Sequence, residues 1–127
     1  MRFPTLLTIA AVLGIVFGVA FLFAPASALG PYGVRTDASG LIMGQFFGAA
    51  LLQLALVFWF LRDLPASHIP RMALGACAGE LLGLWVALRI QLAGHVNALG
   101  WSTVAIYALL AIGFGMFAFG IGRWVKP

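Results

Sequence analysis

Charged side chains are scarce in this 127-residue sequence. Asp, Glu, Lys and Arg make up 8% of the residues, whereas soluble domains carry roughly 25%. Because a soluble fold needs charge to face water, this deficit excludes an ordinary water-soluble domain. The hydrophobic fraction is 64%, which points to the lipid bilayer as the solvent of the chain. The net charge of +4 forms no basic cluster interleaved with aromatics, so nucleic acid is not an expected partner.

Residues that could carry chemistry are equally few. Cys77 is the only cysteine, which excludes an intrachain disulfide, a CxxC pair and a thiolate metal cluster. His68 and His95 fall in predicted loops on opposite sides of the membrane and cannot share a metal ion within one bundle. No Ser-His-Asp set, carboxylate pair or nucleotide-binding glycine loop occurs. We predict no catalytic or metal-binding residue and no cofactor, although the apolar surfaces leave room for a bound lipid, quinone or pigment.

Four long apolar runs dominate the sequence instead. With a rise of ~1.5 Å per residue, a run of about 20 residues crosses a hydrocarbon core ~30 Å thick. The predicted spans cover residues 5–24, 41–61, 71–92 and 101–122. In lipid every backbone amide must be satisfied internally, which favours helices. We therefore predict one domain over residues 1–127, an all-α integral membrane four-helix bundle.

The segments between the spans contain helix-breaking and capping residues. Residues 25–40 hold two prolines, several glycines and short polar side chains, and form the longest predicted loop, in which Asp37 or Ser39 can cap the next helix. Residues 62–70 form a polar turn with two prolines, and residues 94–100 form a tight turn.

The first span has a second interpretation. Arg2 before an apolar run, followed by Ala26, Ser27 and Ala28, resembles a secretory signal with a small-residue cleavage site. The run is longer than the 7–15 apolar residues typical of such signals. We therefore interpret it as a retained transmembrane helix.

Basic residues predict the orientation. With four spans, both termini and the turn at 62–71 lie on one side of the membrane, and cytoplasmic segments carry the excess of Lys and Arg. Five basic residues on that side against two on the other predict cytoplasmic termini, with residues 123–127 as an interfacial anchor. The first group is Arg2, Arg62, Arg71, Arg123 and Lys126; the second is Arg35 and Arg89.

Small residues recur one helical turn apart in every predicted span. Lipid tails are as apolar as leucine, so membrane helices associate through close backbone contact over small residues. Such motifs predict a tightly packed bundle, and they would also serve a homo-oligomer or a larger membrane complex. They are Gly14 and Gly18; Gly44 and Gly48; Gly75, Gly79 and Gly83; Ala111 and Gly115; and Ala118 and Gly122.

Glu80 is the one acidic residue deep inside a span, where an ionised carboxylate costs several kcal/mol unless it is paired, protonated or hydrated. At ~100° per residue it shares a face with small residues, which points it toward another helix. That face comprises Ala76, Gly79, Glu80, Gly83, Ala87 and Gln91.

Gln53 lies at the same predicted depth as Glu80, so we predict a hydrogen bond between them. Gln45, Gln91 and Tyr107 are predicted to form a second polar layer nearer the outer face. This intramembrane polar site has three interpretations: polar contacts that hold helices together, a carboxylate in a proton or substrate path, or a contact with a partner subunit or cofactor.

Residues 20–61, with LFAPASALGPYG, RTDASG and GQFFGAALLQLALVFW in order, resemble small DoxX-like four-helix bacterial membrane proteins. The resemblance implies a four-helix fold in a bacterial inner membrane. It implies little chemistry, because those families mostly lack an assigned activity. Taken together, the glycine-lined faces and the missing catalytic set favour a non-enzymatic accessory or assembly subunit. The main alternative is a small proton-linked transporter or channel that uses Glu80. A membrane enzyme acting on a lipid or isoprenoid ranks last, because it would have only Glu80, His68 and His95 for its chemistry.

Overall fold

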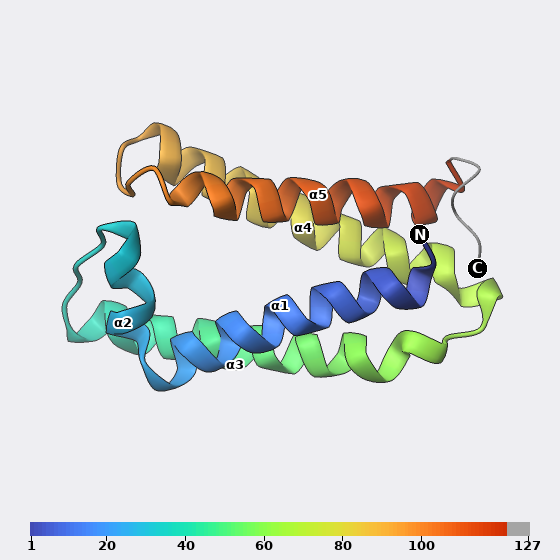
Figure 1. Cartoon of the computed structure of the whole chain (residues 1–127), viewed down its shortest axis with the longest axis horizontal. Helices are drawn as coiled ribbons and strands as arrows, with labels where there is room; N and C mark the ends of the chain where they lie inside the picture. The colour runs from blue at the N-terminus through green and yellow to red at the C-terminus, as the bar shows by residue number, and fades with distance from the viewer. Residues whose placement is uncertain (122–127) are drawn as a thin grey trace. The chain divides into compact units, whose positions relative to one another are not determined.

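A computed structural model describes residues 1–121, and every regular element in that range is helical (Figure 1). The predictions of an all-α fold and of four long apolar helices are confirmed. The long helices are α1 (Phe3–Phe23), α3 (Ala38–Phe60), α4 (Ile69–Leu92) and α5 (Gly100–Phe119). Between them lie the short helix α2 (Pro25–Leu29) and three 3-10 turns, η1 (Gly30–Tyr32), η2 (Leu61–Asp63) and η3 (Ala66–His68).

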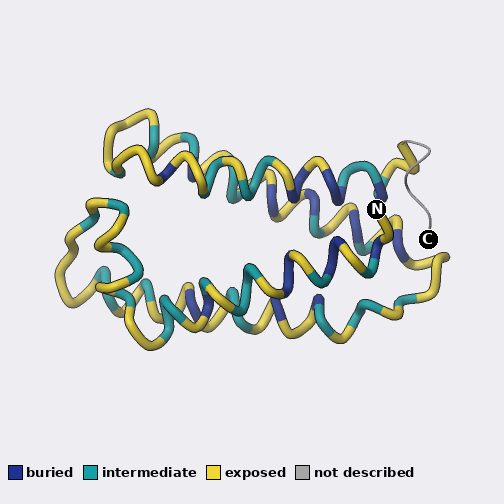
Figure 2. Tube along the Cα trace, in the orientation of Figure 1, coloured by how far each residue is buried: buried dark blue, intermediate teal, exposed yellow. Residues whose placement is uncertain are grey.

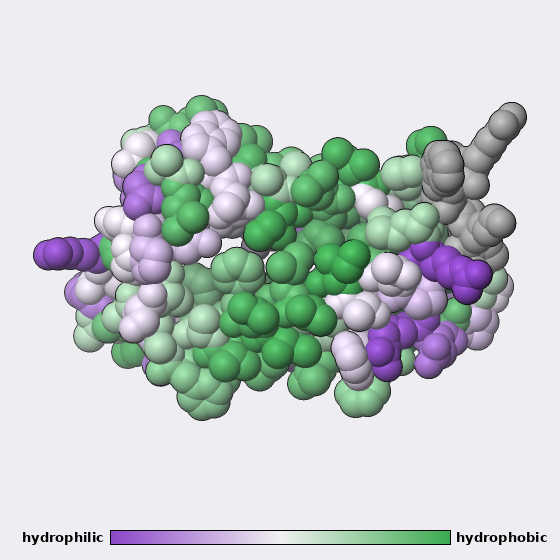
Figure 3. Space-filling view, viewed as in Figure 1, coloured by the Kyte–Doolittle hydropathy of each residue, from purple (hydrophilic) through white to green (hydrophobic). Residues whose placement is uncertain are grey.

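Each long helix has the length and composition of a membrane span. With their flanking turns the four candidate spans contain 20 to 27 residues each, and about 20 apolar residues suffice to cross the hydrocarbon core. The surface in Figure 3 is hydrophobic along the middle of the helices, and hydrophilic residues gather toward their ends. The chain thus has the features of an integral membrane protein.

Local signals explain where α3 begins and where α5 ends. Helix α3 begins at Ala38, three residues before the predicted start, because the Asp37 side chain accepts a hydrogen bond of 3.0 Å from the Gly40 amide. Ser39, the other predicted cap, lies inside the helix. Helix α5 ends at Phe119 because Gly120 adopts a left-handed conformation with φ 62°. The predicted helix end at residue 122 is therefore too late, because Gly120 and Ile121 already lie beyond the helix. Residue 122 itself and the predicted anchor at 123–127 lie outside the described residues.

The predicted loops at 25–40 and 62–70 contain more helix than expected. Pro25 and Pro31 occupy the first turns of α2 and η1, and Pro70 lies in the first turn of α4. The first turn of a helix has amide groups without internal acceptors, so proline loses nothing there. These three prolines, which were predicted to break helices, therefore mark helix starts instead.

Contacts divide the chain into two compact units. One unit, residues 7–61, contains most of α1 together with α2 and α3; the other contains residues 1–6 and the chain from Arg62 onward. In the second unit α4 packs against α5, and buried positions recur along both helices (Figure 2). The prediction of a single domain stays a prediction.

The first turn of α1 packs within the second unit. The Phe3 ring is 1% exposed and meets Phe117 edge to face, with ring centroids 5.1 Å apart. Phe114 lies on its other side at 6.5 Å. Such edge-to-face pairs add about 0.5–1.5 kcal/mol beyond the burial of their area.

Candidate functional site

Helices α1 and α3 meet over glycines in the unit of residues 7–61. A Cβ atom added at Gly14 would lie 2.8 Å from Cβ of Ala55, and one at Gly18 would lie 2.9 Å from the backbone nitrogen of Leu52. One added at Gly48 would lie 2.8 Å from the carbonyl oxygen of Gly18. Backbone thus lies against backbone, the close approach by which small residues join membrane helices.

The remaining predicted packing glycines fall into two groups. Gly44 lies beside Pro25, Gly83 lies against the ring of Tyr107, and Gly115 lies against the sulfur of Cys77. By contrast, Gly75 and Gly79 are exposed, and a Cβ added at either would have no heavy atom within 4 Å apart from the adjoining residues and nearby backbone of α4 itself. The three glycines of α4 therefore do not act as one surface.

The buried face of α4 differs from the predicted small-residue face. The Cys77 thiol is buried and donates a hydrogen bond of 3.3 Å to the carbonyl oxygen of Ala111 on α5. This contact turns the Cys77 side of the helix inward and leaves Gly79, which was predicted to share a face with Glu80, exposed. The buried residues of α4 are Ile69, Ala73, Cys77, Glu80 and Ala87.

Glu80 is the one buried charged residue among those described, and 9% of its surface is exposed. Tyr107 lies near enough to interact electrostatically with its carboxylate and rests its ring on Gly83, one helical turn along. No hydrogen bond or ion pair joins Glu80 to the other described residues of its unit. In hydrocarbon a carboxyl group in this position must be protonated, hydrated or paired with a further group.

The glutamines of the predicted polar site have separate surroundings. Gln53 lies in the unit of residues 7–61 and is exposed, so its predicted hydrogen bond to Glu80 stays a prediction. The Gln45 amide donates to the carbonyl oxygen of Leu22 at 3.2 Å, where the last turn of α1 leaves carbonyl groups without helical partners. The Gln91 amide donates to the carbonyl oxygen of Asn97 at 3.3 Å.

Gln91 also carries an unpaired oxygen. Its Oε1 atom is buried and has no hydrogen-bond partner among residues 1–121. The same atom lies where a Cβ on Gly100 would stand, so the glycine makes room for the amide at the start of α5. The second predicted layer, Gln45 with Gln91 and Tyr107, joins residues of both units and stays a prediction.

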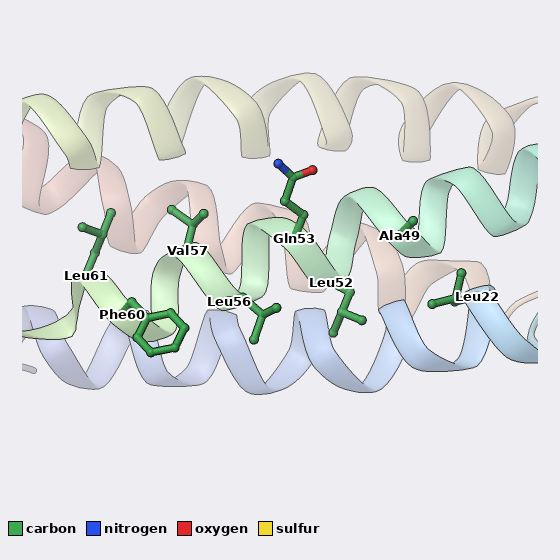
Figure 4. Close-up of a pocket in the computed structure, with 8 residues that line it drawn as sticks. All are labelled: Leu22, Ala49, Leu52, Gln53, Leu56, Val57, Phe60 and Leu61. Atoms are coloured by element: carbon green, nitrogen blue, oxygen red, sulfur yellow. The ribbon is translucent and has the colours of Figure 1, made fainter.

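An open apolar groove of about 590 Å³ runs along one face of α3, near the end of α1. Its α3 residues recur at intervals of three and four, so they form a continuous helix face. Gln53 is the one polar side chain in the lining (Figure 4). The lining residues are Leu22, Ala49, Leu52, Gln53, Leu56, Val57, Phe60 and Leu61.

The sequence reasoning missed two buried features of the second unit. The ring of Phe3 against Phe114 and Phe117 joins residues more than 100 positions apart, and no local pattern points to it. Cys77 was detectable, because it follows Ala73 by four residues and precedes Glu80 by three, which is the spacing of one helix face.

Comparison with known proteins adds no relative: no family model, curated protein or solved structure matches the chain. The resemblance to DoxX-like proteins accordingly stays a prediction. Within residues 1–121, no group of three His, Cys, Asp or Glu side chains is placed to hold a metal ion.

Proposed function

We propose that this chain is a non-enzymatic membrane protein that acts as an accessory or assembly subunit. It docks through α4 onto a transmembrane helix of another membrane protein. The exposure of Gly75 and Gly79 carries this proposal, because no other helix of the described chain lies within 4 Å of a Cβ added at either position.

Helix α4 has a buried face and an exposed face, and the proposal depends on the difference between them. Cys77 and Glu80 belong to the buried face, whereas Gly75 and Gly79 lie roughly 100–160° away around the helix. Glycine is about 1 kcal/mol less favourable than alanine inside a helix. Contact with lipid acyl chains does not offset this cost, because acyl chains pack equally well against alanine. A second helix does gain, because glycine lets two backbones approach closely. A helix with glycine on its outer face is therefore suited to a helical partner.

The proposed location is the bacterial cytoplasmic membrane, with both termini on the cytoplasmic side. The four apolar helices support a location in the membrane. The distribution of basic residues, five on one side and two on the other, supports the orientation. The partners are the bilayer and a larger membrane complex.

The test is co-purification from native membranes in mild detergent after cross-linking. The variant Gly79→Leu fills the exposed face, and Ala105→Leu makes the same kind of change at an exposed small residue of α5. We expect wild type and Ala105→Leu to bring down the same stoichiometric partner, and Gly79→Leu to lose it at unchanged expression. A lone monomer at native abundance, an assembly of this chain alone, or full retention by Gly79→Leu would contradict the proposal.

A small proton-linked transporter or channel is the second candidate. The observation that favours it is Glu80, which is buried beside Tyr107 without a hydrogen bond or ion pair to the described residues of its unit. Such intramembrane carboxyl groups mark proton and ion paths in many transporters. Replacing Glu80 with Gln keeps the shape and removes the charge. Lost flux with normal expression would favour transport over the accessory role, whereas unchanged flux of every tested substrate would remove this candidate.

A further inference from the structure

Glu80 lies deep in its span without a counter-charge. It is 12 residues before the end of α4 at Leu92, hence about 18 Å along the helix axis. Helices α1, α3 and α5 contain no Lys, Arg or His, so none of them can supply a positive charge at this depth. The basic residues of α4 itself, Arg71 and Arg89, are each nine residues from Glu80 and therefore lie on the opposite face of the helix. A bare carboxylate is far costlier in hydrocarbon than its protonated form, so a proton is the partner that neutralises Glu80.

Tyr107 lies beside Glu80 on the side of the hairpin loop, residues 93–99, which joins α4 to α5. Its ring rests on Gly83, one helical turn nearer the loop than Glu80, and the residue interacts electrostatically with the carboxylate. Glycine leaves room for this ring, because a Cβ at position 83 would overlap ring atoms of Tyr107. The phenol is thus held between the carboxyl group and the hairpin loop.

Polar groups continue from Tyr107 to the hairpin loop. Thr103 lies one helical turn before Tyr107 on the same face of α5, and Gly100 lies one turn earlier against the Gln91 amide. The Oε1 atom of Gln91 is buried without a partner among residues 1–121, and a buried oxygen of this kind ordinarily accepts a hydrogen bond from water. Hydroxyl and amide groups therefore recur about every helical turn, roughly 5–6 Å, from the loop to Glu80.

The opposite direction along α4 is closed by apolar packing. The Cys77 thiol, about one helical turn from Glu80, is hydrogen-bonded to a backbone carbonyl oxygen of α5. Beyond it Ala73 and Phe114 are 0% exposed, and the Phe3 ring packs against Phe114. On this side of the thiol the buried residues described for α4 and α5 are all apolar. Proton transfer needs a polar group within hydrogen-bond reach or one bridging water, so a proton cannot follow the two helices past Cys77.

From this asymmetry we infer that Glu80 is a proton-binding site that exchanges its proton with one side of the membrane only, the side of the hairpin loop. Tyr107 is the relay. Its hydroxyl gives a proton to the carboxylate while it accepts another from water beside Thr103, so one O–H bond forms at Glu80 and the phenol is restored. A metal cation does not fit this place, because ions such as Mg²⁺ take about six oxygen ligands and Glu80 is the one acidic residue deep inside a span.

This inference deepens the second candidate function and rests on its Glu80 site, because it names the ion and the side from which the ion enters. It does not depend on the accessory role, since the glycine face of α4 lies away from Glu80.

Labelling with a hydrophobic carbodiimide tests the inference. Dicyclohexylcarbodiimide enters the bilayer and adds to protonated carboxyl groups, giving an N-acylurea without a leaving group, and mass spectrometry locates the product. The full chain is placed in membrane vesicles of both orientations. His95→Cys, at an exposed residue of the hairpin loop, shows with an impermeant maleimide which vesicles carry the loop on the outside.

We expect label on Glu80 in wild type and none in Glu80→Gln. In vesicles with the loop outside, the label should fall by up to about tenfold for each unit by which the external pH is raised, once the carboxyl group titrates. In vesicles of the opposite orientation the same change of external pH should leave the label unchanged. Added Na⁺ should not protect Glu80 in either set.

The relay is tested with a matched pair of variants. Tyr107→Phe removes the hydroxyl and keeps the ring on Gly83, and Tyr32→Phe makes the same change at the only other tyrosine of the sequence. After a jump in external pH, the label should fall at least about tenfold more slowly in Tyr107→Phe than in wild type, because a positioned proton-transfer group contributes a factor of this size or more. Tyr32→Phe should respond like wild type.

The wild-type chain decides the inference even if Tyr107→Phe folds poorly by circular dichroism. An equal response from both sides, a response from the opposite side only or from neither side, no label on Glu80, or protection by Na⁺ would overturn it. A folded Tyr107→Phe that responds at the wild-type rate would overturn the relay. Flux and co-purification through Gly79 judge the two proposed functions separately, because a one-sided proton site labels in the same way whether or not either function is present.

Discussion

The substitution Gly48→Ala, which adds a single methyl group, tests most directly whether α1 and α3 are in close backbone contact. The Cβ of Gly48→Ala would overlap the backbone nitrogen of Leu22 and stand 2.8 Å from both the carbonyl oxygen of Gly18 and the carbonyl carbon of Phe21. These are backbone atoms of α1, so no side chain can rotate away. The two helices would have to separate.

The size of the effect follows from the same distances. Ordinary van der Waals contacts of a Cβ begin at 3.4 Å, so the two contacts at 2.8 Å alone require about 0.6 Å of movement (3.4 − 2.8). The closer contact with the backbone nitrogen of Leu22 requires more. Overpacking of this kind typically costs about 1–3 kcal/mol, which lowers the ratio of folded to unfolded chain about 5- to 150-fold. Separation also loosens the neighbouring contact between Gly14 and Ala55.

Reversible unfolding of the purified chain in mixed micelles, followed by far-ultraviolet circular dichroism, measures this change. Gly75→Ala is the matched control, because the added Cβ meets no atom of another helix within 4 Å. It should leave stability equal or raise it by up to about 1 kcal/mol through helix propensity. Equal stability of Gly48→Ala and Gly75→Ala would refute the close contact of α1 with α3.

Two further predictions concern Phe3 and Asp37. Phe3→Ala empties a fully buried site beside Phe114 and Phe117 and should destabilise the chain by about 3 kcal/mol in the same assay. The control Phe23→Ala, at a position that is 77% exposed, should leave the stability nearly unchanged. Similar losses of stability from both variants would count against the aromatic cluster. Asp37→Ala removes the cap of α3 and should cost about 1 kcal/mol, seen as faster hydrogen exchange over residues 38–41; unchanged exchange there would show that the cap is dispensable.

Hydropathy alone located the four long helices to within a few residues. An apolar run of about 20 residues has little choice but to form a helix in lipid, because its amides find no water. The largest errors came at prolines and caps. Pro70 was placed in a loop and lies in the first turn of α4, because proline is compatible with a helix start as well as with a turn. Asp37 and Ser39 were equal candidates until the hydrogen bond to Gly40 distinguished them.

The composition and periodicity of the sequence by themselves determined that the chain is helical, apolar and marked by glycine at helical spacing. Only the tertiary structure decided which glycines are used. Gly48 and Gly79 both occupy repeats of four residues, yet one lies against a neighbouring backbone and the other lies open. Spacing fixes the angle between residues on one helix, whereas the face that turns inward depends on the surface of the helix beside it. For α4, the contact of Cys77 with Ala111 of α5 turns the Cys77 face inward and leaves Gly79 exposed.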